Sequence, residues 1–136
     1  MIVADTGPLV AALDRDDRDH VRVAAFLADL REPVVVPTPV LYETCFFVGS
    51  RLGAQAEAAL LRQVGQGRLR IERPTDMDYE RAAALVERHG DWPLGAVDGL
   101  VCAIAERLGT LRLLSFDHRH FAALRPAHGD GFELLP

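Results

Sequence analysis

The sequence predicts an α/β fold with three layers, in which a central, mostly parallel sheet of four to five strands lies between helices. Two observations lead to this prediction. Short apolar runs alternate along the chain with longer segments whose apolar residues recur at helical spacing. The run Val34–Val36 is apolar on both faces, which is typical of a strand inside a parallel sheet. Such alternation favours a sheet that helices cover on both sides.

The first half of the chain is predicted to hold three strands and four helices. The apolar run from Met1 forms the first strand and ends at Asp5. Thr6 is expected to cap the next helix, with Pro8 just inside its start, and Thr38 is expected to cap a later one in the same way. In order, the expected elements are a strand at 1–4, helices ending at 13 and 30, a strand at 34–36, helices at 39–52 and 54–64, and an edge strand at 69–72.

The second half is predicted to hold three helices and two strands. Thr75 and Asp78 resemble a capping box that opens a helix, which Gly90 closes. A loop at 91–95 leads into a helix at 96–108. A strand at 111–116 runs into Asp117, a short helix passes through Phe121, and a last strand occupies 132–135.

Length and composition restrict the class of protein. We expect 136 residues to form one domain over 1–136, with the two cysteines as reduced core thiols. No apolar run is long enough to span a membrane, and the start does not read as a signal peptide, so we expect a cytoplasmic protein. The net charge of −5 argues against a protein that coats nucleic acid by bulk charge.

Four carboxylates stand at positions that favour a shared site. Asp5 and Asp117 each follow an apolar strand, and Asp98 lies in the first turn of a helix. Glu43 lies in a helix that is otherwise almost entirely apolar, where an unpaired charge is costly. Either an arginine or a divalent cation can compensate such charges, because Mg²⁺ and Mn²⁺ prefer carboxylate oxygens. The spacing alone leaves both interpretations open.

Each of the four acids lies in a short motif, and the motifs span almost the whole chain: Val3-Ala4-Asp5-Thr6, Val40-Leu41-Tyr42-Glu43, Val97-Asp98-Gly99-Leu100 and Ser115-Phe116-Asp117-His118-Arg119-His120-Phe121. In residues and in order, these motifs resemble those of a known family, the PIN domain, and most closely its VapC group of ribonuclease toxins. Two positions depart slightly, since Gly99 stands where Ala is commoner and Ser115 where Thr is commoner.

The resemblance implies metal-dependent cleavage of RNA. It makes Asp5 and Asp98 direct ligands of Mg²⁺ or Mn²⁺, with Glu43 and Asp117 as ligands directly or through water. Thr6 and Ser115 would orient these carboxylates. It also implies a cognate antitoxin as a partner and a homodimer, with no membrane partner. The apolar helix around Phe46, Phe47 and Val48 can serve such an interface, and plain core suits it at least as well, because the helix also has to cover the sheet.

Other interpretations remain. The chain can be a PIN-like module that binds RNA or protein without catalysis, or a PIN nuclease of RNA processing rather than a toxin. His118 and His120 flank Asp117 and suggest a metal-free acid–base pair, although surface histidines are the simpler interpretation. The signature Asp5-Thr6-Gly7 also occurs in aspartic proteases, but their all-β fold disagrees with the helical periodicity here.

Overall fold

The sheet confirms the predicted fold class. The structure, a computed structural model, describes residues 1–89, 94–122 and 124–136. Within these residues, five strands pair in parallel in the order β3-β2-β1-β4-β5. Strand β3 lies at an edge, as expected. The strands are β1 (Ile2–Ala4), β2 (Val34–Pro37), β3 (Arg70–Glu72), β4 (Arg112–Leu114) and β5 (Glu133–Leu135).

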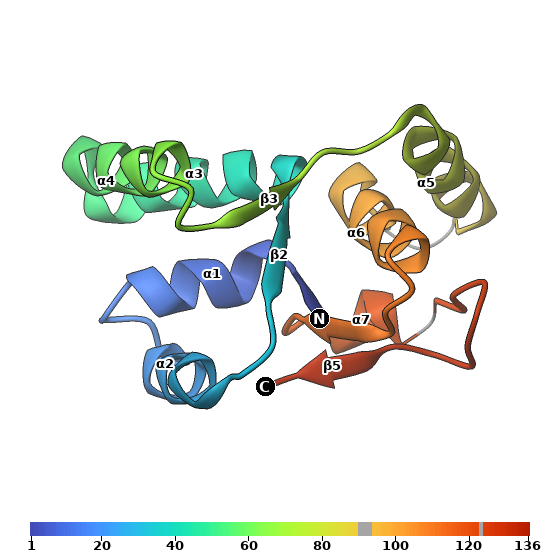
Figure 1. Ribbon diagram of the computed structural model, residues 1–136, viewed down its shortest axis with the longest axis horizontal. Helices are drawn as coiled ribbons and strands as arrows, with labels where there is room; N and C mark the ends of the chain where they lie inside the picture. The colour runs from blue at the N-terminus through green and yellow to red at the C-terminus, as the bar shows by residue number, and fades with distance from the viewer. Residues whose placement is uncertain (90–93, 123) are drawn as a thin grey trace.

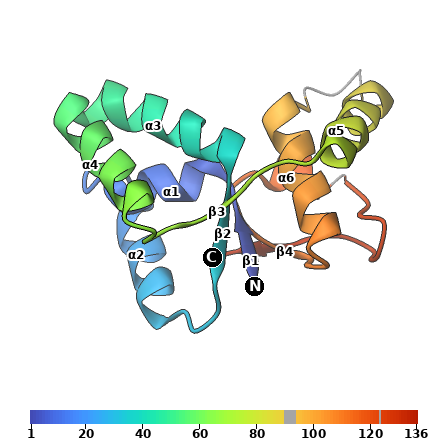
Figure 2. The same ribbon diagram turned by 45° about the horizontal axis from the view of Figure 1, so that its top comes forward.

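Helices cover both faces of this sheet, so the molecule has three layers (Figure 1). The helices α1 to α4 lie on one side, and α5 and α6 lie on the other, as the turned view also shows (Figure 2). The helices are α1 (Thr6–Leu13), α2 (His20–Asp29), α3 (Thr38–Leu52), α4 (Ala54–Gly65), α5 (Asp76–Arg88), α6 (Ala96–Arg107) and α7 (His118–Phe121).

The core lies around the central strand β1. Ile2, Val3 and Ala4 are fully buried, because neighbouring strands and helices on both sides leave no face of β1 in solvent. Burial of a large aliphatic side chain stabilises a fold by about 1.5–3 kcal/mol. Cys45 and Cys102 are both buried and free, which confirms the prediction of core thiols. In the described part of the chain, no helix combines the length and apolarity needed to cross a membrane.

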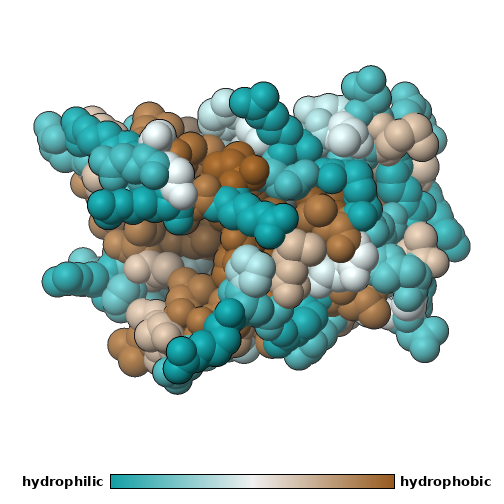
Figure 3. Space-filling model, in the orientation of Figure 1, coloured by the Kyte–Doolittle hydropathy of each residue, from teal (hydrophilic) through white to brown (hydrophobic). Residues whose placement is uncertain are grey.

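The surface keeps an apolar region on the side of α1 to α4. Tyr42 and Phe46 of α3 are 66% and 67% exposed, so this helix does not bury all its large side chains. Brown, apolar surface gathers mostly over this half of the molecule (Figure 3). An apolar cavity of about 350 Å³ lies between Leu13, Leu52 and Leu60, where α1, α3 and α4 meet. Within the segment Phe46–Val48, Val48 is buried in the core, whereas Phe46 and Phe47 are exposed, so the interpretation as plain core holds for Val48 alone.

Two predicted helix caps are wrong, for related reasons. Asp5, in extended conformation, is the N-cap of α1 and accepts a hydrogen bond from the Thr6 N–H, so Thr6 is already the first helical residue. Pro37 precedes α3, and the Thr38 hydroxyl donates to the Glu72 carbonyl at 3.1 Å instead of capping. In both places a strand runs directly into a helix, and the threonine hydroxyl contacts another element of the fold.

The other boundaries differ only slightly from the predictions. The capping box of Thr75 and Asp78 is confirmed at the start of α5. Strand β4 ends at Leu114, two residues earlier than expected, and α7 begins directly after Asp117. The predicted helix end at Gly90 and the loop residues 91–93 lie outside the described residues.

Candidate metal and nuclease site

Asp5 and Asp117 lie at the carboxyl ends of the adjacent strands β1 and β4. The chain builds the sheet outward from β1 to β3, then crosses over to add β4 and β5 on the other side. In parallel sheets, ligands bind at the point where the strand order reverses. Asp5 stands at this point, because its N–H donates to the Leu114 carbonyl at 2.9 Å. Ser115 lies between the two acids and donates from Oγ to Asp5 Oδ2 at 2.7 Å.

Asp117 is held by its own helix. Its Oδ1 accepts a hydrogen bond from the His120 N–H at 2.8 Å, so Asp117 is the N-cap of α7. The Asp117 N–H in turn donates to Ser115 Oγ at 3.0 Å. One buried hydroxyl therefore contacts both strand-end acids.

Glu43 reaches the site from α3. It is half-buried, and its Oε2 accepts a short hydrogen bond from the Thr6 hydroxyl at the start of α1. Because α1 and α3 pack together, the helix after β1 can hold a carboxylate from the helix after β2. The polar contact explains how a charge is tolerated in an otherwise apolar segment.

Asp98 reaches the site from the opposite layer. It is the third residue of α6, and its Oδ2 accepts a hydrogen bond from the Gly95 N–H at 3.0 Å. The partial positive charge of the helix N-terminus stabilises the carboxylate there. Asp98 and Glu43 thus approach the strand ends from the two sides of the sheet.

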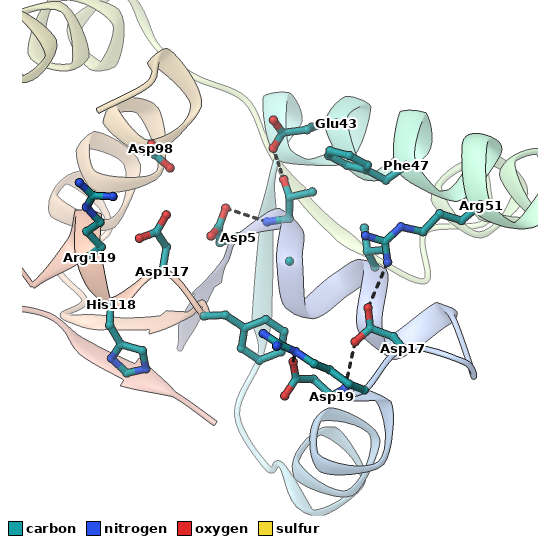
Figure 4. Close-up of a pocket in the computed structure, with 15 residues that line it drawn as sticks. Asp5, Asp17, Asp19, Glu43, Phe47, Arg51, Asp98, Asp117, His118 and Arg119 are labelled. Atoms are coloured by element: carbon teal, nitrogen blue, oxygen red, sulfur yellow. Dashed lines mark hydrogen bonds and ion pairs between the residues drawn. The ribbon is translucent and has the colours of Figure 1, made fainter. Parts of the chain in front are cut away.

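The four acids line one cavity of about 670 Å³. In Figure 4, Asp98 and Asp117 stand on one side of this cavity, Glu43 on the other, and Asp5 between them. The structure therefore brings together all four acids that the sequence singled out. The cavity is lined by Asp5, Thr6, Gly7, Val10, Asp17, Arg18, Asp19, Glu43, Phe47, Arg51, Asp98, Phe116, Asp117, His118 and Arg119.

Burial raises the pKa of two of these carboxyl groups. The pKa of Asp5 is raised mainly by desolvation, with smaller contributions from the charges of Asp98 and Glu43, while the hydrogen bonds from Ser115 and Thr6 lower it. The pKa of Asp98 is likewise raised mainly by desolvation, against the Gly95 N–H and His120. A hard divalent cation offsets both the mutual repulsion and the desolvation of such crowded carboxylates. The donor set therefore fits Mg²⁺ or Mn²⁺.

His120 is a site residue whose place the sequence analysis missed. Its Nδ1 lies 2.8 Å from Asp117 Oδ2 and 3.2 Å from Asp98 Oδ2. Among the described residues, Asp98, Asp117 and His120 form a group whose ligand atoms all lie within 4.8 Å of one another. His118, by contrast, is exposed. The signal was the spacing, since residues three apart share a helix face, so the turn after Asp117 brings His120 beside it.

Known proteins resemble the chain over nearly its whole length. The PIN domain family model matches residues 2–125. Ribonuclease VapC26 of Mycobacterium tuberculosis is 32% identical over 135 residues, which cover 99% of this chain and 100% of that protein.

Solved structures share the fold. The crystal structure of Mycobacterium tuberculosis VapC20, described as a sarcin-ricin loop cleaving toxin, has a TM-score of 0.83 at 24% identity and covers 90% of this chain and 95% of that one. Rickettsia felis VapBC2, crystallised with a DNA fragment from its promoter, has a TM-score of 0.71 at 18% identity and covers 100% of both chains. The chain therefore belongs to the PIN domain family, and within that family to the VapC-like proteins.

Proposed function

We propose that this protein is a metal-dependent endoribonuclease that cleaves RNA phosphodiester bonds and acts as the toxin of a toxin–antitoxin pair. The observation that carries the proposal is the meeting of Asp5, Glu43, Asp98 and Asp117 at one cavity. Membership of the PIN domain family supports it, as does the 32% identity to a ribonuclease that the alignment covers over its whole length.

The proposed roles follow from the contacts of each acid. Asp5 and Asp98 would bind Mg²⁺ or Mn²⁺ directly, and Glu43 and Asp117 would bind it directly or through water. When bound, the cation lowers the pKa of a water molecule that attacks the phosphate and neutralises the charge that develops there. Thr6 orients Glu43 by its hydrogen bond.

The cavity wall offers contacts for a nucleic-acid backbone and for bases. Arg18, Arg51 and Arg119 line the cavity and would contact RNA phosphates. Their local positive charge would attract the RNA backbone although the net charge of the protein is negative. Phe47 and Phe116 line the cavity as well, and aromatic rings stack with unpaired bases. We therefore propose a single-stranded stretch of RNA as the substrate.

The apolar surface beside the site suits a protein partner. Tyr42 and Phe46 are exposed on α3, and exposed aromatic clusters commonly mark interfaces. We propose that this surface contacts a cognate antitoxin or a second copy of the chain in a homodimer. Antitoxin binding is supported by solved relatives that are toxin–antitoxin complexes from Klebsiella pneumoniae and Rickettsia felis.

Cleavage of a labelled single-stranded RNA by the purified protein tests the proposal. We expect cleavage with Mn²⁺ or Mg²⁺, none with a chelator, and none by Asp5→Asn or Asp98→Asn. Expression should inhibit growth, and either variant should relieve the inhibition. If no RNA is cleaved with either metal and neither variant relieves inhibition, the enzyme is excluded in favour of a PIN-like binding module. Cleavage without growth inhibition would instead indicate an RNA-processing nuclease.

A further inference from the structure

The Nδ1 atom of His120 is buried and makes no hydrogen bond among the described residues. Nδ1 lies at contact distance from Asp117 Oδ2 and Asp98 Oδ2, at 2.8 Å and 3.2 Å. It is nevertheless a buried polar atom with no hydrogen-bond partner among the described residues. Distance and direction therefore disagree, since the two carboxylates are near the nitrogen but poorly aligned to accept its proton. A buried polar atom of this kind needs an explanation, and a bound ion is one.

The fold fixes the imidazole at this place. The His120 N–H donates to Asp117 Oδ1, and the Asp117 carbonyl accepts from the Phe121 N–H at 3.2 Å. Phe121 is fully buried in the core, which anchors the turn. The side chain of His120 itself is only 18% exposed. The backbone hydrogen bonds of this turn therefore hold the imidazole beside Asp98 and Asp117.

We propose that His120 is a nitrogen ligand of the divalent cation, together with Asp98 and Asp117. This rests on the metal site of the proposed function and identifies a ligand and a metal preference within it. The ligand atoms of the three residues lie within 4.8 Å of one another, close enough to bind one ion. Asp5 lies between this group and Glu43 in the same cavity, so His120 adds to the ligands of the proposed function without replacing Asp5.

A nitrogen donor changes which metal the site prefers. Mg²⁺ is bound almost entirely by oxygen, whereas imidazole favours transition metals over it. A carboxylate site that includes one imidazole therefore discriminates for Mn²⁺ or Fe²⁺ against Mg²⁺. A site of carboxylates alone would bind Mg²⁺ and Mn²⁺ with less difference.

Electron paramagnetic resonance of the full-length protein with one equivalent of Mn²⁺ tests this inference directly. Electron spin echo envelope modulation detects nitrogen bound to Mn²⁺, and isotope-labelled histidine assigns that nitrogen to an imidazole. We expect imidazole modulation in the wild type and none in His120→Gln. His118→Gln is the matched control, because it removes the exposed imidazole next to Asp117, and it should keep the modulation. The affinity for Mn²⁺ relative to Mg²⁺, from competition, should fall by at least about tenfold in His120→Gln.

The outcomes separate this inference from the proposed function. If Mn²⁺ binds and Asp98→Asn abolishes binding, but the wild-type spectrum shows no imidazole nitrogen, His120 is not a ligand and the metal site stands. If Mn²⁺ does not bind at all, both this inference and the metal-dependent function fail. If His120→Gln does not fold, an imidazole signal that persists in His118→Gln still supports His120 as the ligand, and a wild-type spectrum without that signal still contradicts it.

Discussion

Ser115 Oγ donates a hydrogen bond to Asp5 Oδ2 at 2.7 Å, although 110 residues separate the two in sequence. The same oxygen accepts from the Asp117 N–H, so one hydroxyl sets the positions of both acids at the strand ends. The contact exists because β1 and β4 are adjacent strands whose ends are in register, with Ala4 opposite Leu114.

Removal of the Ser115 hydroxyl should lower the cleavage activity strongly and the free energy of unfolding only modestly. Ser115→Ala leaves Asp5 without one hydrogen bond and frees the start of α7. We expect activity to fall about 10–100-fold and the free energy of unfolding to fall by about 1–2 kcal/mol. Ser115→Thr keeps the hydroxyl and is the matched control. Cleavage rates and denaturant titrations measure both effects, and equal activity of Ser115→Ala and wild type would contradict the orienting role.

The ionised Asp98 carboxylate should lower the free energy of unfolding of the metal-free protein, although the activity requires it. Its pKa is higher in the folded protein than in the unfolded chain, mainly through desolvation, so the folded state binds more protons between the two values. The free energy of unfolding therefore falls as the pH rises from the unfolded pKa through the raised folded one.

We expect metal-free Asp98→Asn to be inactive and to melt at a higher temperature than wild type at neutral pH. The difference should disappear below the unfolded pKa of Asp, about 4. Thermal melts with a chelator across this pH range provide the measurement. A lower melting temperature of Asp98→Asn at neutral pH would show that the carboxylate stabilises the fold.

A bound cation should reverse this effect in the wild type. Any ligand that binds only the folded state stabilises it, by about 2.7 kcal/mol when its concentration is one hundred times its dissociation constant. We expect Mn²⁺ to raise the melting temperature of the wild type, a chelator to remove the rise, and Asp98→Asn to show little of it. Equal rises in both proteins would place the cation elsewhere.

Gly99, one residue after Asp98, marks a close approach of α6 to α5. A Cβ at this position would lie 3.2 Å from the Ala82 carbonyl oxygen and 3.3 Å from the Ala82 Cβ. Gly99→Ala gains helix propensity but forces the helices apart, and we expect a net loss of about 1 kcal/mol in the free energy of unfolding. Ala82→Gly, measured alone and together with Gly99→Ala, separates the Cβ contact from the helix-propensity cost of glycine in α5, and we expect the loss in the double variant to be smaller than the sum of the two single losses. A Gly99→Ala variant more stable than wild type would show that α5 moves away freely.

The sequence predicted the strand-end acids and the layered fold because apolar periodicity and strand order are local signals. The predicted caps at Thr6 and Thr38 failed, because their hydroxyls bond to Glu43 and Glu72, which are distant in sequence. The place of His120 depended on the single turn of α7, for which the sequence indicated a short helix through Phe121 but no starting residue. Exposure of Tyr42 and Phe46 was not predictable from an apolar helix that suits a core or an interface equally.

Anomalous diffraction from crystals soaked in Mn²⁺ shows whether Asp5, Glu43, Asp98 and Asp117 form one cation site. We predict an anomalous peak in the cavity, within coordination distance of Asp98 and of at least one of Asp5 and Asp117, and its absence in Asp98→Asn crystals. A fully soaked crystal with no peak among these carboxylates would show that the four acids do not form a cation site.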